Sequence, residues 1–195
     1  MIRIGVLIES HYDETEFNMF NEVFTRDGYE LEYLSYLWGQ PSLKFTGNDN
    51  NSEVTVTKCV TKADISIYNC VILIGGYATD RLRYQADITN PNSAPAVEFL
   101  RKAVRESEEG RLLIGTICHG LWLFCADKTL LKGRRVTCAH NIICDVENAG
   151  GIVEYEGTRT KDIVIDRGLI SAKHPGVTEL FILTLKAELG VHSTV

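Results

Sequence analysis

Runs of consecutive apolar residues alternate along this chain with segments that have helical spacing. A strand that is covered on both faces is apolar at almost every position, so these runs predict buried parallel strands. The clearest runs occupy residues 2–8, 70–74 and 112–117, and residues 29–37 are predicted as a further strand. The sequence therefore predicts a sheet in which most strands are parallel.

A helical pattern follows the first of these runs. Asp13 and Glu16 stand three residues apart, as the partners of a capping box do, and Gly28 is typical of a helix end. Four apolar side chains between these points fall on one helix face: Phe17, Phe20, Val23 and Phe24. Similar spacing predicts further helices over residues 97–110, 142–149 and 177–189.

The second half of the chain continues this alternation. Residues 135–138 are predicted as a strand, and 163–171 as a hairpin with a turn at 166–168. Residues 84–95, rich in Asn and Pro, are interpreted as an inserted connection. Because no linker or internal repeat divides residues 1–195, we expect one α/β domain, a sandwich with helices on both faces of a mostly parallel sheet.

Composition excludes several classes of protein. The chain has 195 residues, of which 45% are hydrophobic and 24% charged, as in an ordinary globular protein. Twenty Lys and Arg against 26 Asp and Glu give a net charge of −6, so we expect no nucleic-acid partner. No apolar run approaches the roughly 20 residues of a membrane span. The first residues also do not resemble a secretion signal, so we expect no membrane association and a cytoplasmic location.

Cysteine spacing and glycine motifs give no sign of a metal or a cofactor. The six cysteines include no C-x-x-C pair, which argues against a zinc ribbon or a redox dithiol motif. Gly75-Gly76 does not extend into a dinucleotide fingerprint, and no phosphate-binding loop motif occurs. We therefore predict no metal and no cofactor.

The most informative segment joins the run at 112–117 to a helical pattern that begins near His119. Cys118 falls on this junction between Gly115 and Gly120, which is the layout of a nucleophile elbow. A sulfur at a helix N-terminus is close to unpaired N–H groups, which favour thiolate over thiol. Cys118 is thus either a reactive nucleophile or a buried cysteine that fills a strand end.

Two other strand ends are expected to meet this junction. Glu9 follows the first strand and Gly75-Gly76 the strand at 70–74, and parallel strands bring their carboxyl ends to one crevice. Glu9 in that crevice could exchange protons with the sulfur or the substrate, unless it is an exposed loop carboxylate. The backbone N–H groups of Gly76 and His119 are candidates for an oxyanion hole.

Several segments in this order give the chain a recognisable signature. They are Glu9, Ile74-Gly75-Gly76, Asp80-Arg81-Leu82-Arg83, Ile117-Cys118-His119-Gly120, Leu131-Lys132-Gly133-Arg134, Asn148-Ala149-Gly150-Gly151 and Ser171-Ala172-Lys173-His174-Pro175-Gly176. On these segments the sequence resembles the PfpI-type intracellular protease family. That family lies within the DJ-1/ThiJ/PfpI superfamily, which also includes the Parkinsonism-associated protein deglycase.

The resemblance implies a flavodoxin-like three-layer sandwich and a homo-oligomer. It further implies that Cys118 is the nucleophile, that Glu9 is the carboxyl partner of its sulfur, and that His119 is its catalytic neighbour. An acid from another subunit would orient this histidine, and the matching residue is Asp80, where the family often has Glu. Trp122 stands where close relatives usually carry Pro.

Two further histidines remain open. His174-Pro175 resembles the histidine region of glutamine amidotransferases, but Gly176 stands where those enzymes have Glu, so amidotransfer is disfavoured. His140-Asn141 follows a predicted strand and either faces the crevice or lies on the surface.

Two classes of function fit these residues. The first is a cysteine-dependent enzyme in which Cys118 attacks a carbonyl, either of a small 2-oxoaldehyde in a glyoxalase or deglycase reaction or of an amide in a peptidase reaction. The second is a non-catalytic redox sensor or stress-protective protein in which Cys118 is oxidised to a sulfinate. The expected partners are a small molecule or a peptide and other copies of the chain.

Overall fold

A seven-stranded sheet forms the centre of the computed structural model, which describes residues 1–49, 52–84 and 93–192. Its strand order is β12-β13-β7-β6-β1-β2-β5, and every neighbouring pair is parallel except β12 and β13. The strands are β1 (Arg3–Leu7), β2 (Glu30–Ser35), β5 (Lys58–Cys59), β6 (Cys70–Leu73), β7 (Leu113–Ile117), β12 (Ile163–Asp166) and β13 (Leu169–Ala172). The prediction of a mostly parallel sheet is confirmed. Most of the connection predicted at 84–95 lies outside the described residues.

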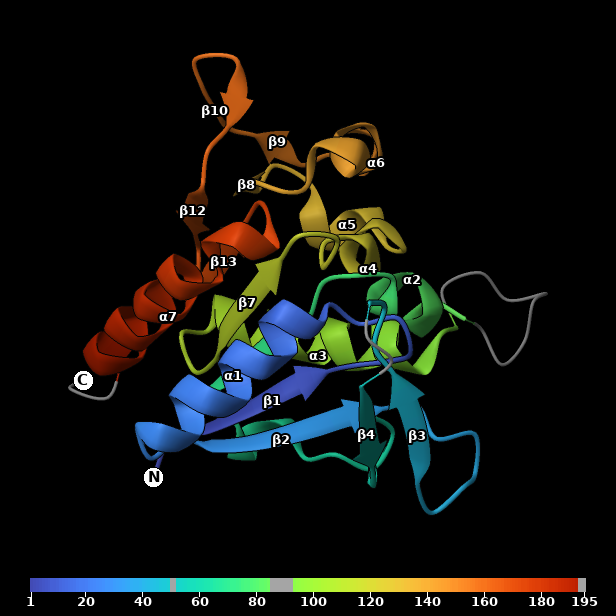
Figure 1. Ribbon diagram of the computed structural model, residues 1–195. Coiled ribbons are helices and arrows are strands. Elements are labelled where there is room, and N and C mark those ends of the chain that lie inside the picture. The colour runs from blue at the N-terminus through green and yellow to red at the C-terminus, as the bar shows by residue number, and fades with distance from the viewer. Residues whose placement is uncertain (50–51, 85–92, 193–195) are drawn as a thin grey trace.

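Helices cover both faces of this sheet. Helices α1 (Glu14–Arg26) and α7 (Thr178–His192) pack against each other on one face, and Figure 1 shows them running side by side. Helices α2 (Ala78–Leu82), α3 (Pro95–Glu108) and α4 (Trp122–Cys125) contact one another on the other face. The fold is therefore a flavodoxin-like α/β sandwich, as expected.

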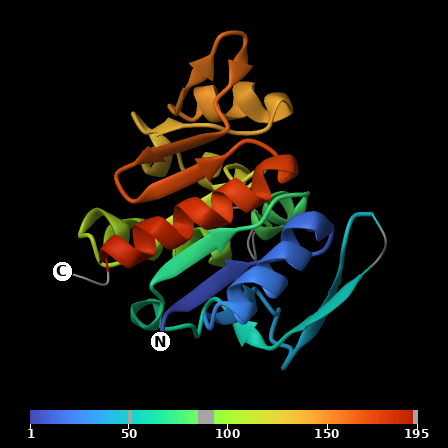
Figure 2. The same ribbon diagram turned by 60° about the vertical axis from the view of Figure 1, so that its left-hand side comes forward.

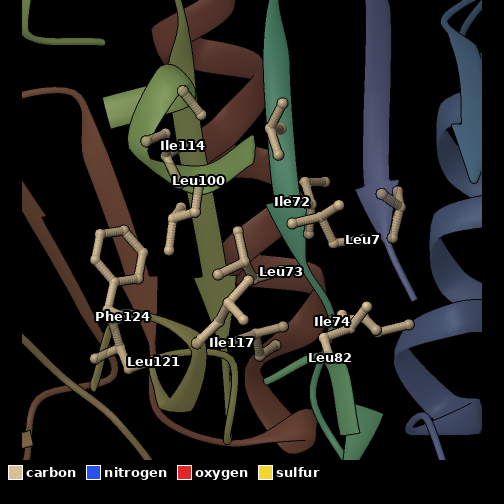
Figure 3. Close-up of a cluster of buried hydrophobic side chains, with 14 of the residues drawn as sticks. Leu7, Ile72, Leu73, Ile74, Leu82, Leu100, Ile114, Ile117, Leu121 and Phe124 are labelled. Atoms are coloured by element: carbon tan, nitrogen blue, oxygen red, sulfur yellow. The ribbon is translucent and has the colours of Figure 1, made fainter. Parts of the chain in front are cut away.

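The interior of the sandwich is apolar on both sides of the central strands. Every residue of β6 and β7 is buried, which explains why these strands are continuous apolar runs in the sequence. Figure 3 shows side chains of β1, β6 and β7 packed with Leu82, Leu100 and Phe124 from the helical layer. No helix among the described residues has the length and apolar character that crossing a bilayer requires.

Small elements extend the sandwich at both ends (Figures 1 and 2). One end carries the hairpin β3 (Leu43–Thr46) and β4 (Glu53–Val56). The other carries the pair β8 (Arg135–Val136) and β9 (Ile152–Val153) and the hairpin β10 (Tyr155–Glu156) and β11 (Arg159–Thr160). The remaining short helices are η1 (Ile65–Ile67), α5 (Lys128–Leu131), η2 (His140–Ile142), α6 (Ile143–Asn148) and η3 (Pro175–Val177).

The strand predicted at 135–138 is shorter than expected and lies outside the main sheet. Only Arg135 and Val136 pair, with β9, because the next backbone groups have other partners. The N–H of Thr137 donates to the Ser171 hydroxyl at 2.9 Å, and the N–H of Ala139 donates to the Cys118 carbonyl at 3.2 Å. After Val136 the chain therefore no longer pairs with β9, and it passes the end of β7.

Candidate active site

Cys118 follows β7 directly and stands in a strained turn. Its φ is +57°, in the left-handed region that residues with a side chain rarely adopt. Its N–H donates to the Ala172 carbonyl at the end of β13 at 3.0 Å, which fixes the turn against the sheet. The predicted elbow is therefore present.

The helix after this elbow starts later than the sequence suggested. Helix α4 begins at Trp122 and has four residues, so the sulfur does not sit at a helix N-terminus. The N–H groups of Gly76 and His119 hydrogen-bond to the sulfur instead and lower the pKa of the thiol. Both proposed oxyanion-hole donors therefore face Cys118.

The carboxyl group beside Cys118 belongs to Glu16, in the first turn of α1. A methyl group placed on Gly75 would lie 2.5 Å from Glu16 Oε1 and 2.7 Å from Cys118 Cβ, so all three residues meet at one point. Glu16 is fully buried, and its Oε2 accepts the Gly75 N–H at 2.6 Å. Its Oε1 has no hydrogen-bond partner among the described residues, which leaves that oxygen available to the reacting atoms.

Glu9, predicted as the partner of the sulfur, has different neighbours. Its carboxylate accepts the Ser10 N–H at 2.6 Å and pairs with Arg81 at 3.2 Å. The carboxylates that act on the Cys118 thiol are Glu16 and Asp13. The placement of Glu9 is thus corrected, because the strand end directs it toward α2 while α1 directs Glu16 into the crevice.

Burial disfavours the charged forms of both Glu16 and Cys118. It raises the pKa of Glu16 well above its usual 4.5, and the nearby Asp13 raises it further. Burial, followed by the charge of Glu16, raises the pKa of Cys118 to about 12. This overturns the expected low-pKa thiol, because loss of solvent and a neighbouring negative charge outweigh two backbone hydrogen bonds.

His119 is held through both ring nitrogens. Nδ1 lies 3.1 Å from the Gly76 carbonyl oxygen and Nε2 lies 2.8 Å from the Asn141 side-chain oxygen Oδ1, so both ring nitrogens face an oxygen acceptor. The imidazole also stacks on Trp122 with ring centroids 4.5 Å apart. Neither nitrogen is left in this arrangement to take a proton from Cys118.

The turn at Gly75-Gly76 connects these parts. Gly76 has a φ of +71°, and a methyl group there would lie 2.3 Å from the His11 carbonyl, so only glycine fits. The peptide bond between Gly76 and Tyr77 is held on both sides. The Gly76 carbonyl oxygen faces the His119 ring, and the Tyr77 N–H donates to the His11 carbonyl at 2.7 Å. His119 and Asn141 thus help to fix the turn that presents the Gly76 N–H to the sulfur.

Asp80, predicted to orient a histidine across a subunit contact, pairs within its own helix region. Its carboxylate forms a close ion pair with Arg83, on the half-exposed side of α2. Among the described residues, the side chain that hydrogen-bonds to the His119 ring is that of Asn141, not that of Asp80.

Two members of the site escaped the sequence analysis for identifiable reasons. Glu16 was assigned to a capping box, and Asp13 does accept the Glu16 N–H at 3.0 Å, but the Glu16 side chain turns inward. The available signal was its spacing of four and eight residues from the buried Phe20 and Phe24. Asn141 was noted beside His140, and it is the asparagine that faces the crevice.

No cluster of three or more His, Cys, Asp or Glu suited to a metal occurs in the part of the chain that the structure describes. The six cysteines are free thiols. The chemistry available at this site is therefore that of a thiol, a buried carboxyl group and backbone N–H donors.

Comparison with known proteins agrees with this geometry. The family model described as "DJ-1/PfpI family" matches residues 2–188. The chain belongs to the DJ-1/PfpI family. Curated DJ-1/PfpI relatives include "Protein/nucleic acid deglycase 2" of Escherichia coli, 25% identical over 89% of both chains. Another is "General stress protein 18" of Bacillus subtilis, 25% identical over 84% of this chain and 86% of that protein.

A solved structure from Anabaena variabilis shows the same fold. It is a two-domain protein with DJ-1/ThiJ/PfpI-like and ferritin-like domains, and it matches with a TM-score of 0.80 and 25% identity. The match covers 97% of this chain and 48% of that protein, so this chain spans about half of its length.

Proposed function

We propose that this protein is a cofactor-independent, cysteine-dependent enzyme that acts on small carbonyl compounds in a glyoxalase or deglycase reaction. The observation that carries the proposal is the pairing of Cys118 with the buried Glu16, whose Oε1 is left without a partner. A buried carboxyl group with a raised pKa can give and take protons near neutral pH. The deglycase among its relatives supports this reaction class.

The first step is addition of the sulfur to an aldehyde. Glu16 as a carboxylate takes the thiol proton, and the thiolate forms a C–S bond while the carbonyl π bond breaks. The resulting oxyanion is stabilised by the N–H groups of Gly76 and His119 and then takes the proton back from Glu16. The product is a hemithioacetal on Cys118.

The second step moves one proton between two carbons of a 2-oxoaldehyde. Glu16 removes the proton from the carbon bonded to sulfur and returns it to the neighbouring carbon, while the hemithioacetal hydroxyl proton passes to the oxygen of that neighbouring carbon. Together these transfers convert the hemithioacetal into a thioester of a 2-hydroxy acid. Water then hydrolyses the thioester and restores the thiol. No electrons are exchanged with any group outside the substrate.

The arrangement of His119 makes amide hydrolysis the less favoured activity. A cysteine peptidase needs a histidine that takes the thiol proton and gives it to the leaving amine. Here Gly76 and Asn141 hold both ring nitrogens, so the proton acceptor at the sulfur is Glu16. Amides and peptides are nevertheless the second substrate class to assay.

Conversion of methylglyoxal to lactate by the purified protein tests the proposal. We expect turnover that Cys118→Ala abolishes and that Glu16→Gln lowers by about 100-fold or more, the usual contribution of a general acid–base. Cys144→Ala is the matched control, because Cys144 is an exposed thiol outside the site. Absence of carbonyl turnover together with peptidase activity that needs Cys118 would overturn this reaction class.

A redox-sensing role for Cys118 is the second candidate. The Gly76 and His119 N–H groups and the free oxygen of Glu16 surround the sulfur and could hold the oxygens of a sulfinate. The raised thiol pKa opposes fast oxidation. Mass spectrometry after mild peroxide decides between the two: selective oxidation of Cys118 without carbonyl turnover supports the sensor.

The wider setting belongs to the proposal as well. We expect residues 1–195 to act as one domain in a cytoplasmic homo-oligomer, and the stress protein among its relatives fits a protective role. In an oligomer Asp80 would have to leave Arg83 to reach a histidine of another subunit.

A further inference from the structure

A separate cavity of about 280 Å³ lies beside the Cys118 turn. Residues 138–140 form one wall of this cavity and residues 173–174 another. Both segments adjoin the backbone of Cys118: its carbonyl accepts the Ala139 N–H, and its N–H donates to Ala172, next to Lys173. The reaction described above does not use this cavity.

The hairpin β10–β11 supplies the third wall of the cavity. In Figure 1 this hairpin projects from one end of the molecule. Lys173 joins this hairpin to the sheet, since its Nζ donates to the Thr160 carbonyl at 3.3 Å. Tyr155 and Ile143 add apolar surface next to Ala139. The cavity thus has room for a small ligand with an apolar body.

The charged part of the lining is cationic. Arg159 and Lys173 carry the positive charge, His140 and His174 add imidazole rings, and none of the lining residues is acidic in the part of the chain that the structure describes. Lys173 is paired with Asp162, whereas Arg159 forms no ion pair with any described residue. An uncompensated guanidinium at the mouth of a cavity favours an anionic ligand.

His174 adds a donor of fixed direction. Its Nδ1 accepts the Gly176 N–H at 2.9 Å, so the proton of the neutral ring must sit on Nε2. His174 is also near enough to Asp13 to interact with it electrostatically, although burial dominates and raises the pKa of Asp13. Asp13 in turn acts on the Cys118 thiol, so the pocket lining lies close to the residues around the sulfur.

We propose that this cavity, the hairpin pocket, binds the anionic end of a small organic molecule, a carboxylate or a phosphate ester with an apolar body. Arg159, Lys173 and His174 would hold the anion, and Tyr155 and Ile143 would contact the body. That this molecule is also the substrate of Cys118 rests on the proposed function. The substrate class would then be carbonyl compounds that carry an anionic group.

Binding is tested separately from catalysis with the Cys118→Ser protein. Calorimetric titrations with benzoate, phenyl phosphate and benzyl alcohol compare two anions with a neutral molecule of similar body. We expect at least one anion to bind at least about 10-fold more tightly than the alcohol. Arg159→Gln should weaken the binding of that anion about 10-fold. The stronger of the two anions identifies carboxylate or phosphate as the ligand group.

The control for Arg159→Gln is Arg26→Gln, which changes net charge equally at an exposed site on α1, outside the pocket. Binding of the alcohol as tightly as the anions, or equal anion affinity in the Arg159→Gln and Arg26→Gln proteins, would overturn the pocket assignment.

The link to catalysis is tested with the wild-type enzyme. We expect kcat/KM for 4-carboxyphenylglyoxal to exceed that for phenylglyoxal, and Arg159→Gln to lower the ratio of the two values by about 10-fold, whereas Arg26→Gln leaves this ratio unchanged. Anion binding without this preference would show that the pocket does not serve Cys118. Loss of all turnover with intact anion binding would disprove the proposed function and leave the pocket standing.

Discussion

Glu9 and Glu16 lie seven residues apart, and the fold gives them different environments. Glu9 pairs with Arg81 at 3.2 Å, and its side chain is partly exposed. Glu16 is fully enclosed beside Cys118 and the Gly75 N–H, so its charged form is disfavoured. A buried acid that retains its proton near neutral pH suits proton transfer, whereas an ion-paired acid does not.

The first residue-scale prediction concerns the pH dependence of Cys118 alkylation. Because the charge of Glu16 contributes to raising the thiol pKa to about 12, the rate of iodoacetamide labelling should rise throughout the alkaline range. Glu16→Gln removes that charge, so the rise should level off at a lower pH. Mass spectrometry of the labelled peptide measures the rate. Glu9→Gln is the control, and an equal shift in that variant would contradict the assignment of Glu16.

The second residue-scale prediction concerns Asn141, which we expect to position His119. Asn141→Ala leaves Nε2 without its partner, and we expect kcat to fall about 10-fold because the Gly76 turn is held less firmly. The ¹⁵N resonance of His119 Nε2 should shift in the same variant. Asp80→Ala should leave both quantities nearly unchanged. The opposite pattern would show that an acid from another subunit, rather than Asn141, orients the histidine.

At the scale of elements, the site depends on how closely β6, β7 and α1 approach one another. The turn after β6 has no side chain at Gly75, so Glu16 and Cys118 can both reach the same space. The positive φ of Cys118 turns its side chain toward that space. The residues with positive φ lie in the connections between these elements, at His11 before α1, Gly76 after β6 and Cys118 after β7.

Gly75→Ala tests this close approach. Its methyl group would meet Glu16 Oε1 at 2.5 Å and Cys118 Cβ at 2.7 Å, so we expect a loss of about 1–3 kcal/mol in unfolding free energy. Turnover should fall with it. Gly190→Ala in α7 is the matched control, since nothing lies within 4 Å of the added methyl group. Urea denaturation of the two variants measures the difference, and equal stabilities would contradict the packing.

At the scale of the whole molecule, the buried acid lowers stability as the pH rises. Above pH 4.5 the unfolded chain loses the Glu16 proton while the folded protein retains it, because burial raises the folded-state pKa. The unfolded state then binds fewer protons, so the free energy of unfolding falls by up to about 1.4 kcal/mol per pH unit until the folded-state pKa is passed.

Glu16→Gln should therefore stabilise the protein, and more so at mildly alkaline pH than near pH 4.5. The amide can still accept the Gly75 N–H, so the hydrogen bond is retained while the ionisation is lost. Urea denaturation across this pH range measures the effect. A stability difference that stays constant with pH would mean that Glu16 is charged in the folded protein.

Much of the architecture could be predicted because it depends on local pattern. Continuous apolar runs identified β6 and β7, since a strand buried on both faces has no polar positions. The position of Cys118 after such a run was enough to predict the elbow. The pattern failed after Val136, because the Thr137 N–H donates to the Ser171 hydroxyl and the Ala139 N–H to the Cys118 carbonyl instead of to a neighbouring strand.

The sequence by itself determined the layered fold, the DJ-1/PfpI signature and the nucleophile candidate, because each is written in residues close together along the chain. Only the tertiary structure decided which carboxyl group meets the sulfur, what holds His119 and how the thiol ionises. These depend on side-chain direction and on loss of solvent, which arise when α1, the Gly75 turn and residues 139–141 pack around Cys118. The spacing of Asp13 and Glu16 fits both a helix cap and a buried acid, and only the packed structure shows that the Glu16 side chain is buried.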